Sequence, residues 1–571
     1  MKNARQHRTI QVNNPDIAQN KTAISTDDLV VLNRKEYVEL KCRANYWKAQ
    51  HRRAIEREAL LKEKLQQSQA QIRDLKQRLY GKKSEKGKGK NEASPKTQKG
   101  SPRKKGQQKG SKGHGRTQRA DLPVVEETHD LPPEEKRCSI CGGARPEFFK
   151  TEDSDIIEIQ VSGYIRRIKR KQYKPCHCEK NLMPGIITAP PAARAIPKSS
   201  LGISVLTEVL LDKFLYSRAT NRLCMDFGYL GLPVSQGTIT GALKRLIPLF
   251  EPLAQAMLDK QMTERLFHND ETRWMVFEII EGKTGYRWYL WITQSASVAY
   301  YRIAPGRGAD VPIEHFSAIP EDVLQIIVVC DRYSAYKKLA RKCSFILLAF
   351  CWAHVRRDFL DAARSWPEYE QWMHSWVDDI GQLYKINAAR LEHWDQTRPL
   401  AAQSQAFAEQ QLVLTQKLSQ MVERRDEHLK EQKLAHPKKK VLESLKNHWH
   451  GLTLFVDHPQ VPMDNNTAER GVRNPVTGRK NFYGSGSTWS ATLAAMMFTL
   501  LQTILLWGIN PRHWLDRFLG ACAENGGTPP TDLSPFLPWQ MDEHRKQTLS
   551  RPPPSRIPFP PNAEFESYDS S

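Results

Sequence analysis

Three acidic residues, far apart in the 571-residue chain, are the best candidates for chemistry. Asp270 and Asp331 each end or follow an apolar run, and Glu469 begins an expected helix rich in basic side chains. The basic residues expected to bind DNA phosphates there are Arg470, Arg473, Arg479 and Lys480. Carboxylates bind Mg²⁺ or Mn²⁺, and two such cations together catalyse phosphodiester cleavage. The pattern predicts a magnesium or manganese site, held by the three acids, that acts on a polyanion such as DNA.

Each acid also has a purely structural interpretation. Asp331 could cap the helix that follows it. Glu469 could form an ion pair with Arg473, four residues later on the same helix face. Glu271 competes with its neighbour Asp270 for the site, and in an extended strand the two side chains point to opposite faces. The basic residues could equally form a solvated surface.

The elements that position these acids are expected to form a mixed sheet. Three antiparallel strands and then alternating strands and helices are typical of a ribonuclease-H-like α/β domain, expected over residues 262–520. The expected strands are residues 266–268, 274–280, 286–293, 298–303, 326–330 and 345–351. The charged, helical stretch 354–450 reads as an all-α insertion in this domain. At its start, His354 either contacts a phosphate or a water, or is a structural histidine.

The N-terminal third predicts a long helix and a basic linker. Residues 1–24 are polar and expected to be disordered, and a helix is expected over 25–80. Apolar residues recur at spacings of four and three, as in a coiled coil. The repeating positions are Leu61, Leu65, Ser68, Ile72, Leu75 and Leu79. This helix either pairs two protomers or folds back on its own chain. Residues 81–120 hold fourteen basic and two acidic residues and predict a disordered linker that attracts phosphates.

Four of the ten cysteines form two close pairs separated by 34 residues. Their spacing predicts a zinc-finger-like β module over residues 121–190 with a structural Zn²⁺. The four expected zinc ligands are Cys138, Cys141, Cys176 and Cys178. The second pair has one intervening residue, so His177 could replace one thiolate; four reduced cysteines without metal are the alternative. The other cysteines in apolar strands, such as Cys351, read as core thiols.

Three further segments complete the expected organisation. Residues 197–260 predict helices with helix-turn-helix character that bind DNA, although simple helical packing gives the same pattern. Residues 481–511 carry no charge, but threonines at helical spacing favour a buried helix over a membrane span. Residues 530–571 are proline-rich and expected to be a disordered tail. Without an apolar leader segment, the protein is expected in the cytoplasm.

The net charge of +23 points to nucleic acid as the partner. Basic side chains that neutralise phosphates release counterions, which favours binding. The excess is not confined to residues 81–120, so the folded part is also basic. A basic surface that serves only solubility is the alternative.

Several blocks, in the right order, resemble the transposases of bacterial insertion-sequence family sixty-six. Besides the two cysteine pairs, they are residues 78–86 (RLYGKKSEK), 351–359 (CWAHVRRDF), 464–470 (DNNTAER) and 478–481 (GRKN). The resemblance spans roughly residues 30–515. It implies cut-and-join transposition by an Asp-Asp-Glu triad, which motif matching places on Asp270, Asp331 and Glu469. It also implies small accessory proteins, encoded by the same element, as partners.

Two other functions remain compatible with the same residues. A DNA-binding regulator, or a domesticated relative without catalysis, would keep the fold but cut no DNA. A site-specific nuclease would share the metal site but would not join strands. The coiled coil additionally predicts a homo-oligomer.

Overall fold

The computed structural model describes residues 32–80, 132, 135–144, 161–174, 186–320 and 323–553. They belong to two compact units, one made of Met1–Glu85 with Asp358–Val377 and the other of Lys86–Arg357 with Asp378–Ser571. The segments expected to be disordered at 1–24 and 81–120, and the second cysteine pair, Cys176 and Cys178, lie outside the described residues.

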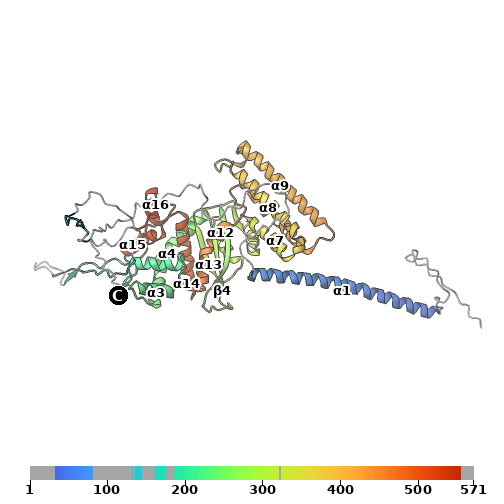
Figure 1. Ribbon diagram of the computed structural model, residues 1–571, viewed down its shortest axis with the longest axis horizontal. Helices are drawn as coiled ribbons and strands as arrows, with labels where there is room; N and C mark the ends of the chain where they lie inside the picture. Colours follow the sequence, from blue (N-terminus) through green and yellow to red (C-terminus); the bar gives the residue numbers. More distant parts are fainter. Residues whose placement is uncertain are drawn as a thin grey trace, which may run out of the picture. The chain divides into compact units, whose positions relative to one another are not determined.

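The first unit is dominated by the 47-residue helix α1, Arg34–Tyr80 (Figure 1). Asn33 and Glu36 exchange hydrogen bonds, because each backbone N–H donates to the other's side chain, at 3.0 and 2.9 Å. This capping box fixes the start of the helix at Arg34, later than the expected position 25. The apolar members of the expected seam are exposed in the single chain: Leu61, Leu65, Ile72, Leu75 and Leu79.

The second unit is built on a five-stranded mixed sheet, so the expected mixture of antiparallel and parallel strands is present. The strands are β3 (Leu266–Met275), β4 (Arg287–Gln294), β5 (Ala299–Ala304), β6 (Ile326–Cys330) and β7 (Ile346–Phe350), in the order β5-β4-β3-β6-β7. β4 is antiparallel to β3 and β5, whereas β6 is parallel to β3 and β7.

Strand β3 differs from the prediction, which divided it into 266–268 and 274–280. It continues through the polar residues 269–273 because β4 pairs with it from His268 to Met275. The first three residues of β3 pair with β6 on the other side. Asp270 therefore lies within a strand, where hydrogen bonds to the neighbouring strand fix its backbone.

Helices cover both faces of the sheet. On one face, Ile292 and Tyr301 share a hydrophobic cluster with α4 and α14. On the other face, Phe267 and Trp291 pack with residues of α5 and α6. The first layer contains α2 (Ile203–Leu210), the π-helix η3 (Leu211–Leu215), α3 (Thr220–Tyr229), α4 (Gln236–Met262), α14 (Thr488–Leu506) and α15 (Pro511–Glu524), and the second α5 (Asp310–Phe316) and α6 (Ser334–Lys342). The expected helical segment 197–260 thus shares its core with the sheet.

Helix α14 lies in the uncharged segment 481–511, for which a buried helix was favoured over a membrane span. It is the one helix in the described residues that is long and apolar enough to cross a membrane, and 67% of its apolar window is buried inside the protein. Its threonines bind the edge strand β5: Ala299 N–H donates to Thr503 Oγ1 (3.1 Å) and Tyr301 N–H to Thr499 Oγ1 (2.9 Å). The polar stripe therefore covers a sheet edge.

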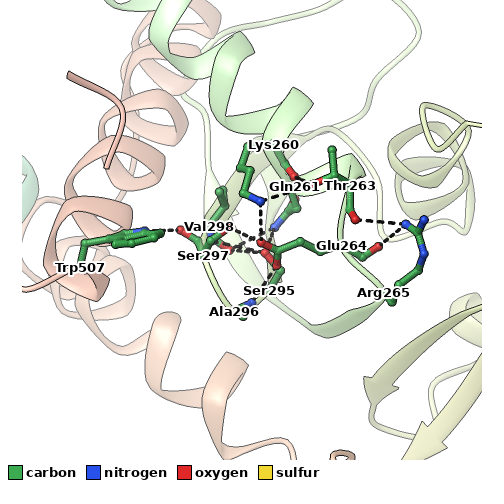
Figure 2. Close-up of polar contacts among 10 residues, drawn as sticks. All are labelled: Lys260, Gln261, Thr263, Glu264, Arg265, Ser295, Ala296, Ser297, Val298 and Trp507. Atoms are coloured by element: carbon green, nitrogen blue, oxygen red, sulfur yellow. Dashed lines mark hydrogen bonds and ion pairs between the residues drawn. The ribbon is translucent and has the colours of Figure 1, made fainter. Parts of the chain in front are cut away.

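The ends of α4 and α14 hold the turn between β4 and β5, as Figure 2 shows. Gln261 Nε2 donates to the carbonyl oxygen of Val298 (3.1 Å), and the Glu264 carboxylate accepts the hydroxyl of Ser297. Trp507 Nε1 donates to the carbonyl oxygen of Ser297 (2.9 Å). These contacts position β4, which in turn aligns the carboxylate-bearing strand β3.

The expected all-α insertion is helical in the structure. Its helices are α7 (Trp352–Ser365), α8 (Glu370–Leu391), α9 (Gln405–Lys430), α10 (His436–Asn447) and α11 (Trp449–Leu452), with short 3-10 turns η4 (Pro367–Tyr369), η5 (Leu400–Ala402) and η6 (Leu454–Val456). The buried Arg390 guanidinium donates to the carbonyl oxygens of Phe455 (2.9 Å) and Val456 (3.1 Å). A buried cation with several acceptors ties α8 to the segment that leads back to the sheet.

One expectation for the smaller segments needs correction. Residues 530–553, expected to belong to a disordered tail, contain η7 (Ser534–Phe536) and α16 (Glu543–Ser550). Phe536 and Leu549 are buried in the core of the second unit, so apolar anchors override the proline content. In the cysteine-containing module, the described strands are short: β1 (Gln172–Tyr173) pairs antiparallel with β2 (Ile187–Thr188).

Candidate metal centre

The three predicted acids come from three elements around β3. Asp270 lies within β3, and Asp331 directly follows β6, the parallel neighbour of β3. Glu469 lies in the first turn of α12 (Asn466–Gly471), a helix that contacts β3 and β4. Burial, then Glu271, and then Asp331 and Glu469 raise the pKa of Asp270 to about 7, against a lowering by the Glu271 backbone N–H. The three carboxylates therefore interact electrostatically.

Asp270 and its neighbour Glu271 have different surroundings. Opposite Asp270 on β4 is Ile292, and opposite Glu271 is Trp291; these two residues belong to the clusters on opposite faces of the sheet. Arg307 binds Glu271 Oε1 (Nη2, 2.5 Å), and the Tyr336 hydroxyl donates to its Oε2 (2.6 Å). Arg307 and Tyr336 thus compensate the charge of Glu271 on the face of the sheet opposite to Asp270.

The carboxylate of Asp270 has no cationic partner among the described residues. Its Oδ1 accepts the backbone N–H of Glu271 (2.8 Å). Asp270 is half-buried, and an ionised carboxylate that is partly removed from water beside other acids is costly unless a cation compensates it. A divalent cation is the kind of group that this arrangement lacks.

Asp331 does not cap α6, because the N-cap residue is Tyr333 and no side chain caps the helix. Its Oδ1 accepts the backbone N–H of Tyr333 (2.9 Å), just before α6 begins at Ser334. This bond leaves the second carboxylate oxygen for another ligand. The turn formed by Asp331 and metal binding by its other oxygen are therefore compatible.

Glu469 does not form the expected ion pair with Arg473 in the described part of the chain. Its Oε1 instead faces His354 Nδ1 at 3.8 Å. Burial and then Arg357 lower the pKa of His354, whereas Glu469 and Asp331 raise it. A third residue, Cys351, lies in the same cluster, and the ligand atoms of all three residues are within 4.8 Å of one another. The interpretation of Cys351 as a simple core thiol missed this cluster.

Asn465 is a second residue that the sequence analysis missed. It is buried, and its Nδ2 donates to the carbonyl oxygen of Asn269 (2.7 Å). Its Oδ1 lies 3.2 Å from His268 Nδ1, and its backbone N–H donates to Cys351 Sγ (3.3 Å). Asn465 therefore joins the start of α12 to the backbone beside Asp270 and to the start of α7.

The end of α12 lies unusually close to the sheet. A Cβ on Gly471 would overlap Cδ1 of Ile292 on β4. The Tyr301 hydroxyl donates to the carbonyl oxygen of Gly471 (2.9 Å). Glycine at this position allows the helix that carries Glu469 to approach the strand beside Asp270.

The predicted DNA-binding cations separate into two groups. Arg470, Arg473 and Lys480 are exposed on α12 and α13 (Arg473–Phe482). Arg479 is partly buried, and its Nη1 donates to Thr272 Oγ1 (3.0 Å) and to a carbonyl oxygen of β3. Arg479 thus attaches α13 to β3, whereas the other three face solvent.

The first cysteine pair has the geometry of a tight turn. Cys138 N–H donates to the carbonyl oxygen of Gly143 (2.9 Å), and Gly142, at φ +73°, donates back to Cys138 (2.9 Å). The backbone N–H groups of Cys141 and then Ile140 lower the pKa of the Cys138 thiol. Backbone donors around a sulfur favour the thiolate form that binds zinc.

Comparison with known proteins places this architecture among mobile-element proteins. The model of the transposase IS66 family matches residues 198–493, just over half of the chain. The uncharacterized protein y4hP of Sinorhizobium fredii is 26% identical over 434 residues, which cover 72% of this chain and 74% of that protein. Protein y4jD of the same organism is 24% identical over 422 residues, covering 72% and 79%. No solved structure matches the chain.

Proposed function

The chain belongs to the IS66 family of transposases, and from this premise we propose that it cuts the ends of its DNA element and joins them to target DNA with divalent cations. The placement of Asp270 on β3, of Asp331 directly after the adjacent strand β6 and of Glu469 on α12, which contacts β3, carries the proposal. A half-buried carboxylate with acidic neighbours, and no cationic partner among the described residues, fits a site that binds Mg²⁺ or Mn²⁺.

The sheet supports a ribonuclease-H-like catalytic domain. Three antiparallel strands, β3 to β5, are followed by β6 and β7, which add in parallel on the other side of β3. The carboxylates of β3 and of the residue after β6 then lie on adjacent strands. This order brings residues that are distant in sequence to one position, as two-metal catalysis requires.

Each acid has a distinct task in the proposed reaction. Asp270 and Asp331 hold the cations from the sheet, and Glu469 adds a ligand from α12. When bound, the cations activate the attacking water or 3′ hydroxyl and stabilise the leaving oxygen. Arg470, Arg473 and Lys480, exposed on α12 and α13, bind phosphates of the substrate.

Other parts of the chain position the DNA in this proposal. The turn at Cys138 and Cys141 supports a structural zinc, with Cys176 and Cys178 as the remaining ligands. The segment 197–260 and the basic linker 81–120 contribute DNA contacts. Two copies pair through α1, and small proteins of the same element assist them.

The test uses labelled element ends with Mg²⁺ or Mn²⁺ and the full-length protein. Asp270→Asn, Asp331→Asn and Glu469→Gln should each reduce cleavage and joining at least roughly 100-fold, since even groups behind a metal ligand contribute 10–100-fold. DNA binding in a gel-shift assay should persist. The matched control is Asp464→Asn, because asparagine keeps the side-chain oxygen that accepts the N–H of Asn466 (3.0 Å).

Each alternative has its own outcome in this test. A clear gel shift without any cut strand in the unaltered protein would identify a DNA-binding regulator. Cleavage without joining would identify a nuclease. Full activity in any one of the three variants would exclude that residue from the site.

A further inference from the structure

We propose that Cys351, His354 and Glu469 form a binding site for a thiophilic divalent cation such as Zn²⁺. Cys351 and His354 lie at the start of α7, and Glu469 reaches them from α12. Their ligand atoms lie within 4.8 Å of one another. The inference rests on the proposed function only because Glu469 would serve both this cation and the carboxylate centre.

The spacing between His354 and Glu469 fits two ligands of one cation. Nδ1 and Oε1 are 3.8 Å apart, too far for a hydrogen bond. In a tetrahedral site with bonds of about 2.0–2.3 Å, neighbouring ligand atoms lie roughly 3.3–3.8 Å apart. A shared cation would therefore fit between these atoms with little rearrangement.

Both atoms also lack any other partner. His354 Nδ1 and Glu469 Oε1 are buried and make no hydrogen bond within the described residues. A buried polar atom without a partner destabilises the folded protein, so such atoms are rare in native proteins. Two of them facing each other indicate a missing group that both would bind.

The sulfur of Cys351 is surrounded by backbone donors. Burial raises the pKa of the Cys351 thiol, whereas the N–H groups of His354, Asn465 and Ala353 lower it. The Asn465 N–H donates to Sγ at 3.3 Å. Backbone donors at the start of a helix stabilise a thiolate. The contacts of Trp352 are separate, because its Nε1 donates to the carbonyl oxygen of Leu452 (2.7 Å).

The donor types decide which cation fits. Mg²⁺ prefers six oxygen ligands, whereas a thiolate, an imidazole and a carboxylate suit Zn²⁺. Three protein ligands leave the fourth tetrahedral position for a water or a phosphate oxygen. The cluster therefore belongs to a different class from the all-carboxylate centre of Asp270 and Asp331.

Cobalt substitution in the full-length protein tests the proposal. The four ribbon cysteines are first changed to serine, so that Cys138, Cys141, Cys176 and Cys178 bind no metal. Co²⁺ bound by a thiolate gives a charge-transfer absorption band, which we expect in this background at one Co²⁺ per chain. Cys351→Ala should abolish the band. The matched control is Cys330→Ala, which removes another buried cysteine outside the cluster.

A second variant keeps the test decisive if Cys351→Ala does not fold. His354→Gln leaves the cysteine in place but should weaken Co²⁺ binding and change the band. An absent band in the serine background, or a band unchanged in both Cys351→Ala and His354→Gln, would overturn the proposal. Cleavage by Asp270→Asn is scored separately: if this variant stays active while the cobalt band is present, the carboxylate centre fails and the cysteine site stands.

Discussion

Asp270 combines burial with several acidic neighbours. Its pKa rises from 3.8 to about 7, chiefly because of burial and then because of Glu271. Glu271 itself is compensated by Arg307 and Tyr336. Strand β3 therefore holds two adjacent carboxylates, one compensated by Arg307 and Tyr336 and one without a cationic partner among the described residues.

This difference predicts a pH dependence of stability in the metal-free protein. Folded Asp270 holds its proton up to pH of about 7, whereas the unfolded chain releases it near 3.8. The free energy of unfolding should therefore fall as the pH rises through this window. One pKa unit corresponds to about 1.4 kcal/mol, so the loss is of the order of a few kcal/mol.

Urea unfolding between pH 4 and pH 8 in a chelator measures this effect. The Asp270→Asn variant should lack the decline, and Asp464→Asn should retain it. Mg²⁺ at neutral pH should stabilise the unaltered protein but not Asp270→Asn. Equal pH profiles for the unaltered protein and Asp270→Asn would contradict the attribution of this pH dependence to the raised pKa of Asp270.

The site was partly predictable from sequence. Asp331 follows a continuous apolar run, and Glu469 lies in a recognisable block, so single segments were enough to find them. The links between segments were not predictable. The Asn465 side chain donates a hydrogen bond to the carbonyl oxygen of Asn269, nearly 200 positions earlier. No local sequence pattern predicts that contact. Cys351 has the sequence environment of an ordinary core cysteine, and the fold alone brings it to Glu469.

Two threonines of α14 link this helix to strand β5 by hydrogen bonds. The hydroxyls of Thr499 and Thr503 accept N–H groups of β5 that would otherwise be unpaired at the sheet edge. Thr492, on the same helix, is exposed, and its hydroxyl donates to Thr488 on its own helix. The three threonines therefore differ in what their hydroxyls stabilise.

Replacement by valine tests this difference, because valine has nearly the same shape but no hydroxyl. Thr499→Val and Thr503→Val should each lower the free energy of unfolding by about 1–3 kcal/mol, since each leaves a buried N–H without a partner. Thr492→Val should change stability little. Thermal unfolding followed by circular dichroism measures the three variants side by side, and equal stabilities would refute a role for the hydroxyls.

At the level of elements, continuous apolar runs were the reliable signal. The strand predicted at 326–330 is β6, and that predicted at 345–351 contains β7. Strand β3 was divided wrongly because residues 269–273 are polar, and only pairing with β4 keeps them extended. Residues 530–553 were misassigned because prolines obscured the anchors Phe536 and Leu549. In both cases contacts distant in sequence overrode local composition.

Assembly of the complete protein depends in our proposal on α1. Apolar residues on this helix remain exposed in a single chain, including Leu65 and Ile72. The spacings of four and three along the helix fit pairing with a second copy. Two paired copies would allow both ends of a DNA element to be held together.

Glutamate substitutions test this pairing. Replacing Leu65 and Ile72 by glutamate should convert a dimer into a monomer, as measured by light scattering, because charges are not tolerated in a coiled-coil seam. The same charge placed at the exposed Gln66 and Gln71 is the control and should leave the dimer intact. DNA binding to a single end should survive in both variants. An unaltered protein that is already monomeric would exclude pairing through α1.

The contact between α14 and β5 has a consequence for crowding on DNA. An exposed edge strand has unpaired backbone groups that can pair with a strand of another chain. If several copies bound one DNA, as proposed, such edges would come close together. The N–H groups of Ala299 and Tyr301 are already occupied by threonine hydroxyls. This part of the β5 edge therefore offers neither of these donors to a strand of another copy, which disfavours β-type association there.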